Sequence, residues 1–506
     1  MKNVFGVGLL VGALLAAPLV SLLYLLHTAF ATPFTPFDLF DAVVRLLPGR
    51  IVSFGIDSMV RVLMFLGLSL SASSKAAEQI QAIGMFLSVC ALASGIFFAV
   101  LTGLSGAILG IAMAILIAGL AGHPVWTAIA LIIWGIAVGA TRDRIVGRSP
   151  SAPVESVDRR RFLMHLCGTT TSITVVGALV AAALRTSLSK PVVHARSEVD
   201  LPDRTGAIEP APRTRSEYTP VADHYRIDIN LLPIKIDGDS WRLPITGLVE
   251  RPLNLSLQDF RNFAEQQHLF VTLACISNPV GGDLIGTTRW SGVSVRRVLR
   301  DAGVSDRARF LKLTSDDGFY ETVPLDLINS DDRIMFTHMW DGKPLTSEHG
   351  FPLRIYIPDR YGMKQPKWII KAELIENDEP GYWVARGWDK TAQMKATSVI
   401  DTVAVESIYE KDGQKLLPIG GIAHAGARGI SRVEVQVDDG SWVPAALRTP
   451  LSNLTWVIWR YDWPYQPGKH IFRVRCYDGA GAAQIEAPAE PHPSGATGIF
   501  IARRTL

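Results

Sequence analysis

A lone cysteine at the end of an apolar strand is the clearest candidate for chemistry in this sequence. The run from Phe270 to Leu273 is apolar or β-branched, as expected of a strand, and it ends at Cys275 before a loop rich in Gly, Pro and Asn. A thiol in this position suits a metal ligand or a nucleophile. The alternative role is a small buried hydrophobic side chain, which is what most free cysteines are.

The elements that must hold this cysteine lie on both sides of it. After the glycine loop, Trp290 and the segment SGVSV lead into the helical pattern VRRVLRDA, which Gly303 closes as a C-cap. Further strands are predicted at 311–313, 319–323, 353–357 and 368–375. The sequence therefore predicts an α+β domain with a mixed sheet from about residue 221 to 397.

Three sequence blocks together resemble the molybdenum-cofactor domain of the sulfite oxidase family. They are TLACISNPVGG with RWSGVSV around Cys275, HGFPLRIYIPDRYGMKQPKWI from His349 to Ile369, and DHYRIDINLLPIKID near the domain start. In that family the cysteine thiolate is the protein ligand of the molybdenum, and a soft thiolate suits a metal that the pterin sulfurs also hold. The resemblance implies a molybdenum–molybdopterin cofactor.

The resemblance also implies which residues bind the cofactor. Arg and Lys offer charge to a phosphate, and His can donate a hydrogen bond to the pterin or the phosphate. Taken singly, each such residue would be a solvated surface charge. The residues carried over are Tyr225, Arg226, Asp228, Cys275, Asn278, Asp316 (within one residue of register), His349, Arg354, Gln365, Pro366 and Lys367.

Two departures from the family pattern concern the substrate pocket. Animal and plant sulfite oxidases have an Arg soon after the Asn that follows the Cys, whereas here Asn278 is followed by Pro279, a valine and two glycines. Those enzymes also place a Tyr beside the metal where this chain has Trp388, with Arg386 close by. Sulfite is therefore doubtful as the substrate. The candidate catalytic residues are Cys275, Arg386 and Trp388, with Tyr361 and Tyr382 as possible substitutes for the tyrosine.

Length and composition limit the class of protein. A chain of 506 residues is expected to hold about three domains. The hydrophobic share of 48% and the mean hydropathy of +0.23 indicate that part of the chain lies in lipid. The net charge of +3 has no clustered basic face, which argues against nucleic acid as a partner. The four cysteines form no CxxC or CxxCH, which argues against iron–sulfur, zinc and covalent haem sites.

Residues 1–141 are predicted to form a membrane domain of four spans. The run 4–26 is uncharged and apolar, and 80–141 contains no Asp, Glu, Lys or Arg, which is room for about three helices. Breaks are expected at 104–106 and 122–124. Residues 37–70 are predicted to form two interfacial amphipathic helices broken at Pro48-Gly49, with a further span at 51–72 as the alternative.

Residues 142–189 are predicted to be a cytoplasmic linker followed by an export and anchor helix. The run from Arg159 to Arg161 resembles the twin-arginine export motif, and the alternative is an ordinary positive flank on a last membrane helix. Both interpretations send the following residues to the extracytoplasmic side. We expect the helix to remain uncleaved. Residues 190–220, rich in Pro and charges, are predicted to be a linker.

Residues 398–506 are predicted to be an all-β sandwich of immunoglobulin type. Val433, Val435 and Val437 alternate along one strand, and a second strand repeats the pattern up to Cys476. The segment resembles the dimerisation domain of the same family, which implies a possible homodimer.

Two functions of different class follow from these features. The first is a multi-pass cell-membrane oxidoreductase that carries out two-electron oxo transfer on an extracytoplasmic small molecule, such as a sulfoxide or N-oxide, with a quinone or cytochrome as electron partner. The alternative is a membrane transport or sensor subunit with a regulatory molybdopterin domain. The uncharged run 80–141 weakens an ion-path function.

Overall fold

The computed structural model describes residues 4–30, 32–100, 104–121, 124–146, 156–188, 201–202 and 207–506. The chain divides into two compact units, Met1–Leu47 with Lys75–Val193 and Pro48–Ser74 with His194–Leu506. Residues 122–123, part of the predicted linker and export helix 142–189 and part of the predicted linker 190–220 lie outside the described residues.

The first unit is helical and apolar. Among the described residues, three helices are long and apolar enough to cross a membrane, over Val4–Phe30, Leu70–Ala99 and Arg161–Val180, and Gly106–Ile117 is a shorter apolar helix. These long apolar helices indicate association with a membrane. The helices are α1 (Val4–Phe30), α2 (Thr35–Leu46), α4 (Leu70–Ala99, of which the unit takes the part from Lys75), α5 (Gly106–Ala121), α6 (Pro124–Val146) and α7 (Ser156–Leu188).

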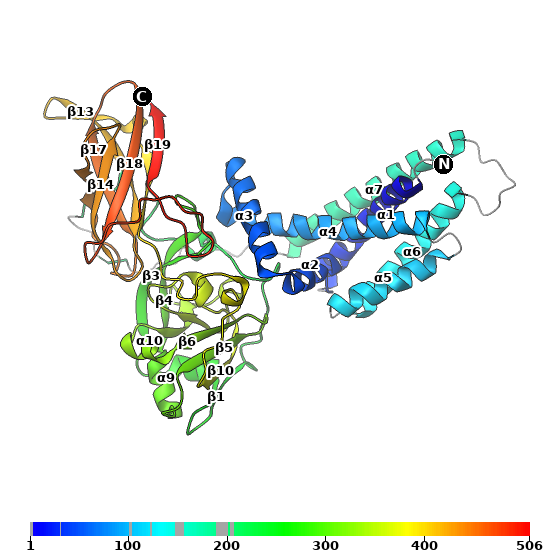
Figure 1. Cartoon of the computed structure of the whole chain (residues 1–506), viewed down its shortest axis with the longest axis horizontal. Helices are drawn as coiled ribbons and strands as arrows, with labels where there is room; N and C mark the ends of the chain where they lie inside the picture. Colours follow the sequence, from blue (N-terminus) through cyan, green and yellow to red (C-terminus); the bar gives the residue numbers. More distant parts are fainter. Residues whose placement is uncertain are drawn as a thin grey trace. The chain divides into compact units, whose positions relative to one another are not determined.

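Small residues let these helices approach closely. A Cβ on Gly106 of α5 would lie 2.2 Å from the carbonyl oxygen of Gly135 on α6, and one on Gly12 of α1 would lie 2.8 Å from the carbonyl oxygen of Cys90. Helix α1 also runs beside α7 (Figure 1), where the Ser21 hydroxyl donates to the Thr174 carbonyl at 3.0 Å. Close packing through Gly and Ser is typical of membrane helices.

The segment predicted to be interfacial forms two helices, α2 and α3 (Gly49–Phe65), and the chain leaves the helical conformation between them at Leu47 and Pro48. Helix α3 has 17 residues, so the alternative of a span over 51–72 does not match a helix in the structure. One face of α3 buries Met59, Val60 and Leu63. Other positions expose apolar rings, including Phe65, which is 90% exposed.

The second unit contains the predicted α+β domain, built on two sheets. One has the order β2-β1-β10-β5-β6, with β1 and β10 parallel and the other pairs antiparallel, and the second has β3-β4-β7-β8 with β9 beside β7. The strands are β1 (Arg242–Gly247), β2 (Leu253–Ser256), β3 (Gln267–Ala274), β4 (Ile285–Ser294), β5 (Phe310–Ser315), β6 (Tyr320–Pro324), β7 (Met335–Trp340), β8 (Lys343–Pro344), β9 (Arg354–Tyr356) and β10 (Ile369–Ile375).

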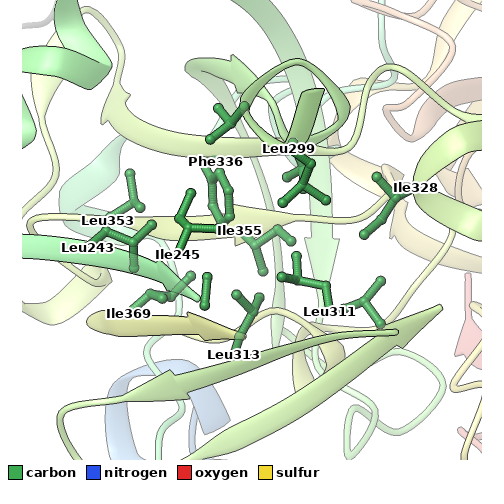
Figure 2. Close-up of a cluster of buried hydrophobic side chains, with 14 of the residues drawn as sticks. Leu243, Ile245, Leu299, Leu311, Leu313, Ile328, Phe336, Leu353, Ile355 and Ile369 are labelled. Carbon is green, nitrogen blue, oxygen red and sulfur yellow. The ribbon is translucent and has the colours of Figure 1, made fainter. Parts of the chain in front are cut away.

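One hydrophobic core joins these sheets and three short helices. Helix α8 (Leu257–Asn262) begins at Ser256, whose hydroxyl accepts from the Asp259 N–H in a capping box. Helix α9 (Val295–Ala302) ends at Gly303, which has φ of +66°, as predicted. The third is α10 (Leu325–Ser330). Figure 2 shows the core between them, including Leu243, Ile245, Leu299, Leu311, Leu313, Ile328, Phe336, Leu353, Ile355 and Ile369.

The C-terminal part is a sandwich of two antiparallel sheets, which agrees with the predicted fold class (Figure 1). Its core joins Leu417 and Trp459 from one sheet to Val433, Val435 and Phe472 from the other. The strands are β11 (Thr397–Val403), β12 (Tyr409–Lys411), β13 (Gln414–His424), β14 (Ile430–Val437), β15 (Val443–Pro444), β16 (Ala446–Leu447), β17 (Val457–Pro464), β18 (Lys469–Asp478) and β19 (Phe500–Thr505).

The sandwich covers the outer edge of β3, which is an edge strand of its sheet. The Thr272 N–H donates to the Leu454 carbonyl at 3.0 Å, and the Ser452 hydroxyl donates to the Phe270 carbonyl at 2.6 Å. The loop before β17 therefore holds the strand that leads to Cys275. Residues 207–220 of the predicted linker have no regular strand or helix, but Arg215 binds Asp401 of the sandwich at 2.7 Å.

Candidate active site

Cys275 directly follows the last residue of β3, as predicted, and its side chain is buried. Its Sγ lies 3.0 Å from the Ser277 hydroxyl. The loop after it closes on itself, because the Cys275 N–H donates to the Leu284 carbonyl at 2.9 Å and the Leu284 N–H donates to Asn278 Oδ1 at 3.0 Å. Asn278 therefore shapes the loop around the thiol.

An apolar wall surrounds the two neighbours of the cysteine. Trp388 and Tyr361 pack in one cluster with Ala274 and Ile276, which flank Cys275. Burial raises the pKa of Tyr361 to about 12, so its hydroxyl stays protonated at neutral pH. The indole N–H of Trp388 is buried and has no hydrogen-bond partner among the described residues, which makes it a donor available to a ligand.

A second cluster is built from two buried histidines and a tryptophan. The rings of His224 and Trp340 are 4.9 Å apart, those of Trp340 and His349 4.6 Å, and the two histidines meet edge to face at 5.6 Å. Burial lowers the pKa of His224 to about 4 and that of His349 well below its ordinary value. Both imidazoles are therefore neutral at pH 7.

Arg354 adds a buried positive charge to this cluster. Its guanidinium carbon lies 4.5 Å from the ring centroid of Trp290 and 5.2 Å from that of Trp340, and Nη1 donates to the His349 carbonyl at 3.1 Å. Burial lowers the pKa of Arg354 to about 10, which still leaves it charged at pH 7. Its Nε is buried and has no partner in the described chain.

Two further cations share one carboxylate nearby. Lys367 Nζ and Arg226 Nε each lie 2.8 Å from Asp228 Oδ2. Burial lowers the pKa of Lys367 to about 8, and the charge of Arg354 acts on it in the same direction. The three cations exceed the charge of Asp228, so this group attracts an anion.

Tyr225 lies close enough to both Cys275 and Arg354 to interact with them electrostatically. Its side chain is buried, and its hydroxyl oxygen would lie 3.3 Å from a Cβ placed on Gly362. The carbonyl oxygen of Ala274 would lie 3.5 Å from the same Cβ. Burial, and next the nearby Cys275, raise the pKa of Tyr225 well above its usual value, so it remains a neutral hydrogen-bond donor.

Other predicted residues meet backbone groups in the structure. The Asp316 N–H donates to the Trp368 carbonyl at 3.0 Å, and Gln365 Nε2 donates to the Arg360 carbonyl at 2.8 Å. The Pro366 carbonyl accepts from the Ile355 N–H at 3.2 Å. These contacts hold the loops beside Lys367.

Arg386 lies in the short 3₁₀ segment Val384–Arg386, two residues before Trp388. Its guanidinium carbon is 3.6 Å from the Tyr382 ring centroid, and Nη1 donates to the Tyr382 carbonyl at 2.9 Å. Arg386 and Tyr382 are therefore a stacked pair on the loop that carries Trp388.

Sequence reasoning missed His224 and the role of Trp340. The signal for His224 was present, since it lies in the block DHYRIDIN directly before Tyr225. A Cβ on Gly286, which follows the glycine loop, would lie 2.7 Å from His224 Cδ2, so any larger residue there would displace the His224 ring. Trp340 carried no local signal, because its contacts come from distant segments.

The donor set suits an anionic, hydrogen-bonding cofactor whose metal accepts a thiolate ligand. His224 Nε2 and Arg354 Nε are buried without a hydrogen-bond partner among the described residues, and the neutral His224 ring lies close enough to Arg354 for the guanidinium charge to act on it. A phosphate would accept bonds from such donors. Within the described residues no group of three or more His, Cys, Asp or Glu side chains could hold a metal.

Comparison with known proteins agrees with this chemistry. The family described as oxidoreductase molybdopterin binding domain matches residues 230–383. Human mitochondrial sulfite oxidase is 26% identical over 331 residues, which are 56% of this chain and 60% of that protein, and a barley (Hordeum vulgare) nitrate reductase is 25% identical over 317 residues, 52% of this chain and 34% of that protein. This chain thus spans about 60% of the length of the sulfite oxidase.

A solved structure supports the same fold. The sulfane dehydrogenase SoxCD from Paracoccus pantotrophus superposes with a TM-score of 0.50 and 19% identity, covering 62% of this chain and 90% of that one. The matched family implies a molybdenum cofactor. Residues 230–383 are therefore an oxidoreductase molybdopterin-binding domain, similar in sequence to the corresponding domain of sulfite oxidases.

Proposed function

We propose that this protein is a membrane-anchored enzyme that transfers an oxygen atom to or from a small molecule, with molybdenum held by the Cys275 thiolate. The observation that carries the proposal is the combination of a buried strand-end thiol with a buried guanidinium, Arg354, whose Nε has no hydrogen-bond partner among the described residues. When bound, the cofactor would supply two-electron oxygen-atom transfer.

Different residues of this chain would bind the cofactor and shield the thiol from water. Arg354, Lys367 and Arg226 would bind the phosphate of the cofactor, and His224 would donate or accept at its ring nitrogen Nε2. On the substrate side, Trp388 and its neighbours would exclude water from the thiol, since Trp388 is only 5% exposed.

Sulfite is a poor fit to the substrate side of this site. A dianion needs positive charge beside the metal, and the position after Asn278 is taken by Pro279. Each missing charge-assisted hydrogen bond costs about 1.5–3 kcal/mol. We expect a neutral S-oxide or N-oxide to react better. Reduction of such an oxide consumes two electrons and two protons and releases the oxygen as water.

The electrons would come from a membrane carrier of the quinol or cytochrome class. The exposed apolar side chains of α3, such as Phe54 at 67% and Phe65 at 90% exposure, support a lipid surface on the second unit. The run Arg159 to Arg161 supports export of the folded domain to the extracytoplasmic side. A homodimer through the C-terminal sandwich rests on the family resemblance.

The decisive experiment is metal analysis of a matched pair of variants. Cys275→Ser is expected to purify folded in detergent with molybdenum content lowered at least tenfold, because an alcohol replaces the soft thiolate ligand. Cys167→Ser, a partly buried cysteine of α7, is the control and is expected to keep its molybdenum. Normal molybdenum content in Cys275→Ser would overturn the assignment.

A kinetic experiment tests the substrate class. The full chain in detergent is assayed with sulfite and an artificial acceptor, and with a sulfoxide and an artificial donor. We expect sulfite to be the poorer substrate by one to two decades in kcat/KM, from the hydrogen-bond cost above at about 1.4 kcal/mol per decade. A sulfite kcat/KM near about 10⁶ M⁻¹s⁻¹ would contradict the proposal.

A further inference from the structure

The loop that follows Cys275 is bonded to a segment from the N-terminal half of the sequence. The Asp283 carboxylate accepts from the Ser69 hydroxyl at 2.6 Å, from the Ser71 N–H at 3.1 Å and from the Ser71 hydroxyl at 3.0 Å. All of these residues belong to the second compact unit.

The serines lie at the start of helix α4. The Ser69 hydroxyl accepts from the Ala72 N–H at 3.2 Å, which is the bond of an N-cap residue, and Ser71 lies in the first turn. Asp283 therefore adds a negative charge to the positive end of this helix, where it is stabilised by the helix dipole and by an N–H that would otherwise lack a helical partner.

Asp283 is also one residue away from the contact that holds the cysteine. Leu284 is buried, its carbonyl accepts from the Cys275 N–H at 2.9 Å, and its own N–H donates to Asn278 at 3.0 Å. A shift of the Asp283 backbone would move Leu284, and Leu284 cannot move without changing the backbone at Cys275.

The same segment meets the loop on the other side of the site. Gly49 begins α3, and a Cβ placed on it would lie 2.5 Å from the Arg386 Cα and 2.6 Å from the Arg386 carbonyl oxygen. Trp388, two residues further, packs against the neighbours of Cys275. Residues 48–74 thus contact both loops that carry the candidate catalytic residues.

We propose that Asp283 is a positioning residue which, bound to the first turn of α4, fixes the Cys275 loop, and that residues 48–74 form a wall of the active site. In this arrangement the beginning of an apolar helix helps to set the geometry of the thiol. The expected effect on enzyme activity rests on the proposed function, whereas the expected effect on the rigidity of the Cys275 loop does not.

The first test follows amide hydrogen exchange in the full chain without cofactor, in detergent. Asp283→Ala is expected to speed amide exchange in the segment 275–285 at least tenfold, because the loop becomes more mobile and the hydrogen bonds of the Cys275 and Leu284 N–H groups open more often. The exchange rates of β5 and β6 should stay unchanged. Asp283→Asn, which keeps one acceptor oxygen, should lie between. The control is Asp326→Ala, an exposed aspartate in the first turn of α10.

A second measurement separates positioning from general stability. In the cofactor-loaded protein, Asp283→Ala is expected to lower kcat about tenfold, with cofactor content unchanged, since small displacements of reacting groups cost this much or more. Ser71→Ala should act in the same direction, and combining it with Asp283→Ala should add almost nothing, because both remove one interaction.

The outcomes can be told apart. Exchange in 275–285 that matches the Asp326→Ala control would overturn the inference, even if Cys275 binds molybdenum. Faster exchange in a protein that takes up no molybdenum would keep the inference and reject the proposed function. If Asp283→Ala does not fold, the exchange experiment is done with Ser71→Ala. Exchange rates in 275–285 of Ser71→Ala equal to those of the wild type would then overturn the inference.

Discussion

Replacing Arg354 by Met separates the stability of the empty protein from its ability to bind cofactor. The Arg354 guanidinium is buried against Trp290 and Trp340, and burial lowers its pKa from 12.5 to about 10. At about 1.4 kcal/mol per pKa unit, carrying this charge costs the empty fold about 3 kcal/mol at neutral pH. Methionine removes that cost and keeps an unbranched apolar stem against the two rings.

The favourable contacts of Arg354 offset most of this cost. The ring contacts are worth about 1–2 kcal/mol and the hydrogen bond to His349 about 1 kcal/mol. The free energy of unfolding of the empty Arg354→Met protein is therefore expected to stay within about 1 kcal/mol of the wild type. Cofactor affinity is expected to fall about 10- to 150-fold, since one charge-assisted hydrogen bond of about 1.5–3 kcal/mol is lost.

The assay is a pair of measurements on the full chain in detergent, namely tryptophan-fluorescence melting of the empty protein and cofactor content after reconstitution. Arg333→Met is the control, because Arg333 pairs with Asp331 at 2.7 Å and is partly exposed. It should lower stability slightly and leave cofactor content unchanged. Full cofactor content in Arg354→Met, or a loss of stability beyond about 3 kcal/mol in the empty protein, would refute the reasoning.

Three other predictions follow from charges described above. Burial lowers the pKa of Lys367 to about 8, so pyrophosphate binding to the empty protein, measured by calorimetry, should weaken as pH rises through about 8, and Lys367→Arg should remove this dependence. His224 has its pKa lowered by burial to about 4 from 6.5, so the unfolded state takes up its proton first and stability should fall between these pH values on acidification, but not in His224→Gln. Arg159→Lys with Arg160→Lys should leave the C-terminal part protected from protease in spheroplasts, and normal exposure would favour a plain membrane helix.

Local patterns were sufficient to predict the elements that carry the site. The strand before Cys275, the helix closed by Gly303 and the break before Gly49 each depend on neighbouring residues, so the sequence predicts them directly. The residues of the cationic group were predicted only from the family resemblance, since no local pattern distinguishes Lys367 from a surface lysine.

Contacts between distant segments could not be predicted in this way. Trp340, His224 and His349 come from three separate segments, and the bond between Ser71 and Asp283 joins residues 212 positions apart. In the membrane part, hydropathy locates apolar runs but does not fix helix lengths. Four spans and an export helix were expected, and three long apolar helices with a shorter one are found among the described residues.

The edge position of β3 has a consequence for how this protein can be divided into fragments. The backbone groups of an edge strand are a template for pairing with other chains, and here Ser452 and Leu454 of the sandwich cover them. A fragment cut before β11 would expose this template next to Cys275 and would be prone to aggregate. The sandwich therefore protects the edge strand of the molybdopterin domain, and we expect a functional chain to need both domains together.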